Sequence, residues 1–239
     1  MSTAIGFIYP DHAAEDDYPR AEKLLNDAGA TVSLEVVHIY GTDLHAIPEL
    51  LDLGSPEKLA RGASLLTDKK PEAVVWACTS GSFVYGPDGA SGQIADLADV
   101  AGVPASSTSF AFVNAAHALG IKKVAVAASY PAEVADLFVR FLAAGGIEVV
   151  SMASKGIDTA AEVGTLTPDQ VLDFARAHDH PDAEAVLIPD TAMHTIGVLS
   201  QLEAELGKPV LTANQVTIWE GLRLAGFTDK QEALGALFT

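Results

Sequence analysis

The chain has a single cysteine, Cys78, in the segment EAVVWACTSGSF at residues 72–83. The segment predicts a strand that ends at the cysteine and a helix that follows it. A thiol at such a junction meets the unpaired N–H groups at the start of the helix, which favour the thiolate. We therefore expect a pKa for Cys78 below the ordinary value of a thiol, and a role as nucleophile or acid/base. The alternative is an inert buried cysteine beside hydroxyl residues that cap the helix.

A second segment, EAVLIPDTAMHT at residues 184–195, repeats this pattern and places Asp190 where the first segment has Cys78. Two more pairs of segments match in the same order along the chain: IGFIYP at 5–10 with VAASYP at 126–131, and GVPASSTS at 102–109 with GKPVLTAN at 207–214. Three matched blocks predict two similar lobes. The alternative is a chance similarity between short apolar runs, which resemble one another easily.

The repeat has a chemical consequence, because open α/β sheets bind ligands beyond the carboxyl ends of their strands. Cys78 and Asp190 would then approach one bound molecule from opposite sides of a cleft between the lobes. The hydroxyl groups of Thr79 and Ser80 are suited to holding a carboxylate. In the second lobe, Asp190 would be an acid or base and Thr191 a substrate contact, or the pair would cap a helix.

The loop after the first predicted strand of each lobe supplies further candidates. Asp11 and His12 either line the cleft or only turn the chain. Tyr9 is expected to pack in the core with its hydroxyl group hydrogen-bonded, whereas Tyr130 is a candidate donor to a substrate carboxylate. His194 is interpreted as a solvated helix histidine, with a proton relay as the alternative.

Two segments are given structural roles only. Asn214 is interpreted as a helix N-cap, and the glycine-rich residues 83–92 are interpreted as a mobile loop.

Short apolar runs alternate with amphipathic segments, which is typical of parallel sheets built from βαβ units. The predicted strands are Ala4–Tyr9, Thr31–Val37, Ala73–Ala77, Val124–Ala128, Glu148–Met152, Ala185–Ile188 and Val210–Leu211. The predicted helices are Asp16–Asp27, Pro56–Leu66, Gly92–Ala101, Ser109–Leu119, Ala132–Ala144, Thr167–Ala177, Thr195–Leu206 and Gln215–Leu224. We place the first lobe at residues 1–118 and the second at 119–239, with a C-terminal helix that can cross between them.

Composition limits the partners. The 239 residues include 14 Lys and Arg against 32 Asp and Glu, a formal charge of -18, and show no basic cluster. Such a chain is a poor partner for nucleic acid or an anionic membrane, although a small anionic substrate can still bind through local donors.

One cysteine excludes an internal disulfide and a cysteine-rich metal site, and no histidine pair has metal-ligand spacing. The N-terminus does not look like a signal peptide and no apolar run is long enough to span a bilayer, so we expect a cytoplasmic protein. A homodimer is the default assembly.

Four segments together resemble the aspartate/glutamate racemase superfamily, in its maleate cis-trans isomerase and arylmalonate decarboxylase branch. They are IGFIYP, ACTSGSFVYG, AASYPAEVADLFVRFL and PVLTANQVTIWEGLRLAG, and they spread over nearly the whole chain. The resemblance implies two pseudo-symmetric, flavodoxin-like α/β lobes, no cofactor, no metal, and catalysis between two facing strand ends. In racemases and the isomerase each of these ends carries a cysteine, whereas the decarboxylase has glycine at the first.

Cys78 falls on the first cysteine position of this branch, but Asp190 stands at the second, and this combination matches neither pattern. Thr79 and Ser80 match the carboxylate-binding hydroxyl residues of the decarboxylase, and Tyr130 matches its tyrosine. The isomerase's first-loop asparagine has no counterpart near Asp11 and His12.

The resemblance favours an isomerase of a small dicarboxylate. Cys78 would add to the alkene, Asp190 would supply acid/base help, and the amides of Thr191 and Ala192 would help to hold the carboxylates. The alternatives are racemase-like proton transfer at the α-carbon of a carboxylate, an arylmalonate decarboxylase-like lyase, and a non-catalytic protein that binds small acids.

Overall fold

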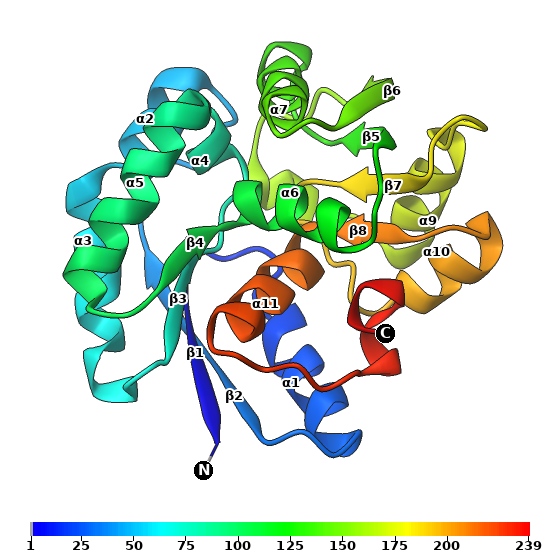
Figure 1. Ribbon diagram of the computed structural model, residues 1–239. Coiled ribbons are helices and arrows are strands. Elements are labelled where there is room, and N and C mark those ends of the chain that lie inside the picture. The colour runs from blue at the N-terminus through cyan, green and yellow to red at the C-terminus, as the bar shows by residue number, and fades with distance from the viewer. Residues whose placement is uncertain (1) are drawn as a thin grey trace.

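Two four-stranded parallel sheets organise the chain, whose computed structural model describes residues 2–239 (Figure 1). The first sheet has the strands β1 (Thr3–Pro10), β2 (Val32–Ile39), β3 (Ala73–Trp76) and β4 (Ala105–Ser107), in the order β2-β1-β3-β4. The second has β5 (Lys123–Ala128), β6 (Glu148–Ser154), β7 (Ala185–Ile188) and β8 (Val210–Thr212), in the order β6-β5-β7-β8. The matching orders confirm the predicted fold of two similar, flavodoxin-like α/β lobes.

Helices connect the strands and cover the sheets. Those that precede β5 are α1 (Asp17–Asp27), α2 (Ile47–Leu53), α3 (Pro56–Leu66), α4 (Ser80–Phe83), α5 (Gly86–Ala101) and α6 (Thr108–Ala118). Those that follow are α7 (Ala132–Ala144), α8 (Ala160–Gly164), α9 (Pro168–Ala177), α10 (Leu199–Leu206) and α11 (Ala213–Leu224). Three short 3-10 turns are η1 (Thr67–Lys69), η2 (Glu232–Leu234) and η3 (Ala236–Phe238).

Local sequence signals explain several of these boundaries. Thr167 and Gln170 form a capping box at the start of α9, with Pro168 in the first turn where its missing N–H costs nothing. In α3 the buried residues Leu59, Ala63 and Leu66 recur at helical spacing, so one face of the helix packs on the sheet. Both helices therefore begin where the sequence predicts them.

Two sequence-based interpretations of elements were wrong. Residues 83–92, predicted as a mobile loop, contain the end of α4 and the start of α5. Gly86, which has a positive φ, is the first residue of α5, and Pro87 follows in its first turn. The strand β4 was missed because its three residues, Ala105–Ser107, carry no apolar run.

The other corrections concern residues after β7 and β8. Asn214 is not an N-cap, because Thr212 is the N-cap residue of α11, and its N–H donates to the side chain of Gln215 at 3.1 Å. The helix α10 begins at Leu199 rather than Thr195, so His194 lies in the irregular segment before it and not on a helix.

The helix α11 packs on the first sheet although it follows the last strand of the second (Figure 1). Its Gly221 lies so close to β1 that a Cβ atom there would overlap Cγ2 of Ile5. A second contact joins the lobes through α6 of the first and α7 of the second. Phe112 of α6 packs edge-on against Phe138 of α7, with ring centroids 5.4 Å apart. As a result, one hydrophobic core runs continuously through both lobes.

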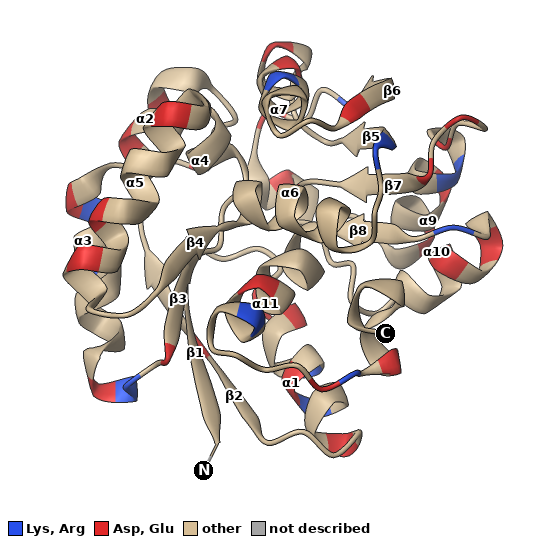
Figure 2. Cartoon of the chain, viewed as in Figure 1, with Lys and Arg blue, Asp and Glu red and all other residues tan. Residues whose placement is uncertain are grey.

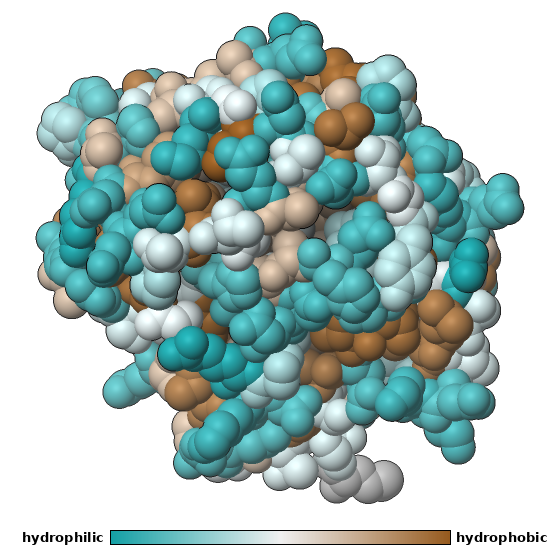
Figure 3. Space-filling view, turned by 180° about the vertical axis from the view of Figure 1, so that it is seen from behind, coloured by the Kyte–Doolittle hydropathy of each residue, from teal (hydrophilic) through white to brown (hydrophobic). Residues whose placement is uncertain are grey.

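The surface carries the acidic residues on most helices, and the few Lys and Arg residues are scattered among them (Figure 2). Hydrophilic residues dominate the face in Figure 3, with apolar residues gathered in smaller patches. Between residues 2 and 239, none of the helices combines the length and the apolar character that crossing a membrane requires.

Candidate active site

A cavity of about 400 Å³ lies where the carboxyl ends of strands from both lobes meet. It is large enough for a small organic acid. Seven of the nine predicted site residues line it: Asp11, His12, Cys78, Ser80, Asp190, Thr191 and Ala192. The two lobes therefore present Cys78 and Asp190 to the same space, from matching positions after β3 and β7.

Cys78 is 4% exposed, and its sulfur accepts a hydrogen bond from the peptide N–H of Gly81 at 3.3 Å. The Ser80 hydroxyl lies 3.7 Å from the same sulfur. Burial nevertheless raises the pKa of the Cys78 thiol to about 11, because these contacts do not offset the loss of solvation, and the charge of Asp190 adds to it. The expectation of a lowered pKa is therefore wrong. The helix after Cys78 has only four residues, and it supplies too few N–H donors to stabilise a thiolate.

Asp190 is 3% exposed, and its carboxylate has three neighbours. Oδ1 accepts a hydrogen bond from the peptide N–H of Ala192 at 2.9 Å. Oδ2 accepts one from the Ser129 hydroxyl, and Nε2 of His45 lies 3.8 Å from the same oxygen. Asp190 caps no helix, since the next one begins at Leu199. The alternative interpretation as an N-cap is therefore wrong, and the carboxylate is free to face the cavity.

Thr79 and Tyr130 lie behind the lining of this cavity and not in it. The Tyr130 hydroxyl donates to the carbonyl oxygen of Pro189 at 2.6 Å, and burial raises its pKa well above the ordinary value. The hydroxyl oxygen of Thr79 is buried and has no hydrogen-bond partner among residues 2–239. Direct contact of either side chain with a substrate would require a local rearrangement.

Three buried side chains, Tyr9, Asp17 and Asn214, fix the segment after Asp190. The Tyr9 hydroxyl donates to the Thr191 carbonyl at 2.8 Å and accepts from the N–H of Ala14 at 3.0 Å. Asp17 accepts hydrogen bonds from the N–H of Thr195 at 2.9 Å and from the Asn214 amide at 3.1 Å. The predicted core position of Tyr9 is correct, and its hydroxyl group also joins the two lobes.

The loops after β2 and β6 meet across the mouth of the cavity. Leu44 and Thr159 form an antiparallel bridge, and the His45 N–H donates to the Asp158 carbonyl at 2.7 Å. The Ala160 N–H donates a hydrogen bond to the Asp43 carbonyl at 2.9 Å. This inter-lobe ribbon, which we define as residues 43–45 with 158–160, carries His45 into the cavity lining.

Sequence reasoning missed His45 and the contact of Ser129 with Asp190. Ser129 had a signal, because it belongs to the segment VAASYP that repeats IGFIYP. His45 had only its place in a loop after a predicted strand, and its pairing with Asp190 depends on how the two lobes meet. His194, the histidine that the sequence did single out, bonds Asp16 at 2.7 Å and lies outside the cavity lining.

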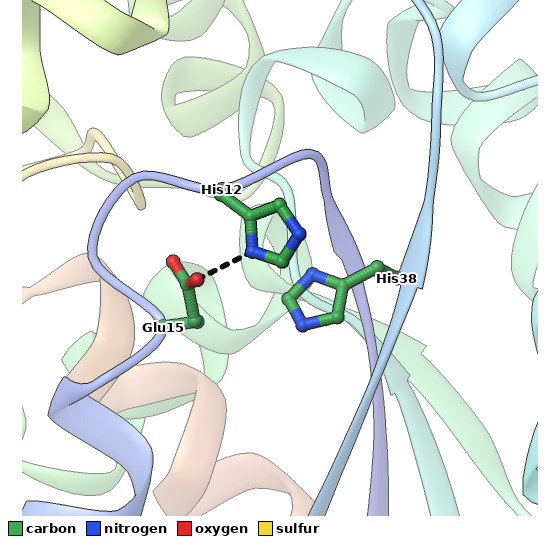
Figure 4. Close-up of side chains that lie close together, drawn as sticks. All are labelled: His12, Glu15 and His38. Carbon is green, nitrogen blue, oxygen red and sulfur yellow. Dashed lines mark hydrogen bonds and ion pairs between the residues drawn. The ribbon is translucent and has the colours of Figure 1, made fainter.

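His12, which lines the cavity, lies beside Glu15 and His38 (Figure 4). The ligand-type atoms of His12, Glu15 and His38 all lie within 4.8 Å of one another, a spacing that a cation could bridge. However, Nδ1 of His12 bonds Glu15 at 2.6 Å and Nδ1 of His38 bonds the Asp11 carbonyl at 2.7 Å. The cluster is therefore held by its own hydrogen bonds. Sequence spacing could not find it, because the two histidines are on different elements.

The lining of the cavity contains Asp11, Asp43 and Asp190 but no Lys or Arg among the described residues. Its basic side chains are the imidazoles of His12 and His45. Burial raises the pKa of Asp11, and the charge of Asp43 adds to that effect. An anionic ligand must therefore be held by hydroxyl groups, peptide N–H groups and imidazoles.

Comparison with known proteins agrees with this geometry. The arylmalonate decarboxylase family matches residues 54–238. A maleate isomerase from Geobacillus stearothermophilus is 27% identical over 173 residues, which are 70% of this chain and 69% of that protein. An arylmalonate decarboxylase from Bordetella bronchiseptica is 29% identical over 153 residues, which are 62% of each chain and so less than two thirds of the decarboxylase.

Among solved structures, a mutant maleate cis-trans isomerase from Nocardia farcinica with a covalently bound succinylcysteine intermediate superimposes with a TM-score of 0.89. It is 21% identical, and the superposition covers 100% of this chain and 98% of that one. The shared fold extends over both lobes, and the family match covers most of the chain. The chain belongs to the arylmalonate decarboxylase family, which lies in the branch of the aspartate/glutamate racemase superfamily that also holds the maleate isomerases.

Proposed function

We propose that this protein is a cofactor-independent isomerase of a small cis-dicarboxylate, with Cys78 as nucleophile and Asp190 as acid/base. One observation carries the proposal: Cys78 and Asp190 lie after matching strands of the two lobes and face the same cavity. A nucleophile on one side and a proton donor on the other can add to and leave from the two ends of a double bond.

Each step of this reaction balances in atoms and protons. The sulfur of Cys78 forms a bond to one alkene carbon, and the other carbon receives a proton from the Asp190 side. The proton of the thiol passes to the Asp190 side in exchange. The former double bond is now single and rotates. The reverse steps return the proton, break the C–S bond and release the trans isomer.

The cavity supports this sequence in two ways. Its position buries the reacting sulfur, which strengthens interactions with a bound anion. Ser80 and Thr191 line it with hydroxyl groups that suit carboxylates, whereas the peptide N–H of Ala192, expected to hold a carboxylate of the substrate, is bonded to Asp190 instead. The Nocardia farcinica isomerase, which has the same fold, was captured with a succinylcysteine, the kind of thioether that this mechanism requires of Cys78.

A second candidate function is proton transfer at the α-carbon of a carboxylate, with or without loss of CO₂. The observation that favours it is the raised pKa of Cys78, which keeps the thiol protonated at neutral pH. A thiol is then a ready proton donor, and Asp190 on the other face is a ready acceptor. Decarboxylation would use the same thiol or carboxyl group to protonate the carbanion that CO₂ leaves behind.

The experiment is to incubate the protein in D₂O with a panel of small mono- and dicarboxylates and to follow the reaction by proton NMR. The isomerase is supported if wild type converts a cis alkene to its trans isomer and Cys78→Ala does not. Deuterium at an α-carbon, or loss of CO₂ from a malonate, supports the second candidate. Binding of an acid without any conversion would show a non-catalytic binding protein.

Mass spectrometry provides a separate test of the covalent step. Trapping by rapid acid quench should find a mass increase equal to the dicarboxylic acid on the peptide that contains Cys78, which is the only cysteine in the chain. Ser80→Ala is a useful companion variant, because it keeps the thiol and removes a neighbouring hydroxyl. If wild type turns over the substrate and rapid quenching finds no adduct, Cys78 is not the nucleophile.

A further inference from the structure

His45 is a buried histidine of the first lobe that lies against Asp190 of the second. We infer that His45 and Asp190 form a pair that shares one proton, and that this pair takes the place of the second cysteine. The inference rests on the proposed function and names how its acid/base group is supplied with a proton. His45 acts through Asp190 and is therefore a positioning residue.

The hydrogen bonds of the imidazole fix its tautomer. Nδ1 of His45 lies 3.0 Å from the carbonyl oxygen of Ile157. A carbonyl oxygen only accepts, so Nδ1 carries a hydrogen. In a neutral ring, Nε2 then has a lone pair, and it is Nε2 that lies 3.8 Å from Oδ2 of Asp190.

A lone pair facing a carboxylate is unfavourable, and both groups are buried. The exposed fraction of each side chain is 4%. The contact becomes favourable when one proton is added, either on Nε2 as an imidazolium beside a carboxylate or on Asp190 as a carboxyl group beside neutral imidazole. One proton in the pair therefore stabilises the contact. At 3.8 Å the two atoms lie within ion-pair distance but beyond hydrogen-bond distance, so a side-chain rotation must bring Nε2 and Oδ2 together before the proton passes between them.

The surroundings hold the pair in place on both sides. The peptide N–H of His45 bonds the Asp158 carbonyl at 2.7 Å, and the ring packs edge-on against Tyr130 with centroids 5.0 Å apart. Ser129 and the N–H of Ala192 orient the Asp190 carboxylate. The other ionisable groups that line this cavity are Tyr9, Asp11, His12, Asp43 and Cys78, and the ring of Tyr130 packs edge-on against the imidazole.

This arrangement explains why an aspartate can stand where a second cysteine is expected. An unassisted carboxyl group is ionised at neutral pH and has no proton to give, whereas a thiol keeps its proton. An imidazole exchanges a proton near neutral pH. By placing an imidazole against Asp190, the chain lets the carboxylate accept a proton from substrate and deliver one to it within a single cycle. Protons balance, because the pair of His45 and Asp190 receives the thiol proton of Cys78 when Asp190 protonates the substrate, and the reverse steps return both protons.

The inter-lobe ribbon places His45 against Asp190. Its backbone hydrogen bonds pair the loop after β2 with the loop after β6, so each lobe supplies one side of the ribbon that holds the imidazole.

The first test is the pH dependence of turnover in wild type, His45→Asn and the control His117→Gln. Asparagine can keep the bond to the Ile157 carbonyl but cannot carry the shared proton. His117 also bonds a backbone carbonyl, that of Gly145 at 2.9 Å, but it is exposed and has no carboxylate partner. We expect His45→Asn to lower kcat by about 10²-fold with KM changed by less than about threefold. In wild type we expect kcat to fall as the pH rises. In His45→Asn the midpoint of this fall should lie about 2 pH units lower, because only a carboxyl group is left to hold the proton.

His117→Gln should leave both kcat and the profile unchanged. If folded His45→Asn loses kcat at the same pH as wild type, the inference is overturned. If His45→Asn does not fold, as judged by its melting curve, His45→Gln serves in its place.

The second test needs no substrate, so it separates this inference from the proposed function. Nitrogen-15 NMR of labelled histidines, with the His45 signal assigned by its loss in His45→Asn, follows protonation of each ring nitrogen. With Asp190 replaced by Asn, the midpoint for Nε2 of His45 should fall by about 1 pH unit or more, because its anionic partner is gone. The same midpoint in wild type and Asp190→Asn would overturn the inference. A shift without catalysis on any acid would leave the pair intact and count against the proposed function instead.

Discussion

The hydroxyl group of Tyr9 in the first lobe donates a 2.8 Å hydrogen bond to the carbonyl oxygen of Thr191 in the second, one residue after Asp190. The same oxygen of Tyr9 accepts a bond from the N–H of Ala14. One side chain thus joins the loop after β1 to the loop after β7. It fixes how far apart the two lobes hold their reactive groups.

Tyr9→Phe should therefore affect both stability and turnover. Loss of the hydroxyl leaves the buried N–H of Ala14 without a partner and the Thr191 carbonyl with only its bond from the Asn214 amide, which we expect to lower the free energy of unfolding by about 1–3 kcal/mol. Turnover should fall as well, because the segment that carries Asp190 is less fixed. Denaturant melts and initial rates measure the two effects.

The matched control is Tyr85→Phe, since the Tyr85 hydroxyl bonds the Leu51 carbonyl within the first lobe. It should lower stability without a comparable loss of kcat. Equal effects of the two substitutions on kcat would show that the link between Tyr9 and Thr191 has no particular role.

Alkylation tests the protonation state of Cys78. Because burial raises its pKa to about 11, its thiolate fraction at pH 7 should be about 10²-fold below that of an unperturbed cysteine. We expect iodoacetamide to react correspondingly slowly with the folded protein and faster as the pH rises toward 11. Intact mass spectrometry gives the rate without ambiguity, because the chain has one cysteine.

The urea-unfolded protein provides the reference rate for this measurement. A folded protein that reacts as fast as the unfolded one at pH 7 would contradict the raised pKa and would revive the expectation of an activated thiolate.

Replacement of Asp190 tests its acid/base role. Asp190→Asn keeps the size of the side chain and its bond from Ala192 but cannot accept a proton, so kcat should fall by about 10²-fold or more. Asp182→Asn removes a carboxylate from an exposed loop and should leave kcat unchanged. Steady-state assays of both, on the acid that the NMR panel identifies, compare the two effects, and unchanged turnover in Asp190→Asn would exclude the role.

Acid–base linkage at Asp17 gives a prediction for stability. Burial raises the pKa of Asp17, outweighing its bonds from Thr195 and Asn214. A carboxyl group whose pKa is higher in the folded state favours folding when protonated. Its stabilising contribution is complete below the pKa of the unfolded chain and is lost as the pH rises through the folded-state pKa.

Relative to Asp17→Asn, the wild-type free energy of unfolding should therefore decline as the pH rises upward from about 4. Urea melts at closely spaced pH values for both proteins measure this difference, in which the other acidic groups cancel. A difference that grows with pH over this range would show that the hydrogen bonds to Asp17 dominate over its burial.

Two glycines give opposite predictions for packing. Gly221→Ala forces a Cβ atom into Cγ2 of Ile5, so we expect a loss of about 1–3 kcal/mol in the free energy of unfolding. Gly92 lies inside α5, and a Cβ atom added there would have no neighbour within 4 Å, so Gly92→Ala should stabilise by about 0.5–1 kcal/mol. Thermal and chemical denaturation of the two variants compare them, and stabilisation by Gly221→Ala would contradict the close packing of α11 on β1.

Much of the fold could be predicted because its signals are local. Apolar runs mark seven of the eight strands, six of them with four to seven residues and one with two, and the pairing of EAVVWACT with EAVLIPDT reveals the twofold arrangement. The strand β4 escaped because Ser106 and Ser107 are buried polar residues whose place is set by the neighbouring strand. The same repeat predicted that Cys78 and Asp190 would share a site.

What sequence alone could not supply was contact between distant segments. His45 meets Asp190 across 145 positions of the chain, and Asn214 meets Asp17 across 197. The pKa of Cys78 was predicted in the wrong direction for the same reason. The local junction suggested helpful N–H groups, whereas the total burial imposed by both lobes decided the outcome.

The position of α11 on the first sheet has a consequence for how the chain is made. Residues that emerge first from a ribosome include the strands β1 and β3, yet the helix that covers them is encoded more than a hundred residues later. During synthesis an apolar face of the first sheet therefore stays exposed to solvent. The sheet is fully packed only after α11 has been synthesised and has docked on it. Such long-range closure is slow, so a nascent chain stalled before residue 213 would be a natural client for chaperones.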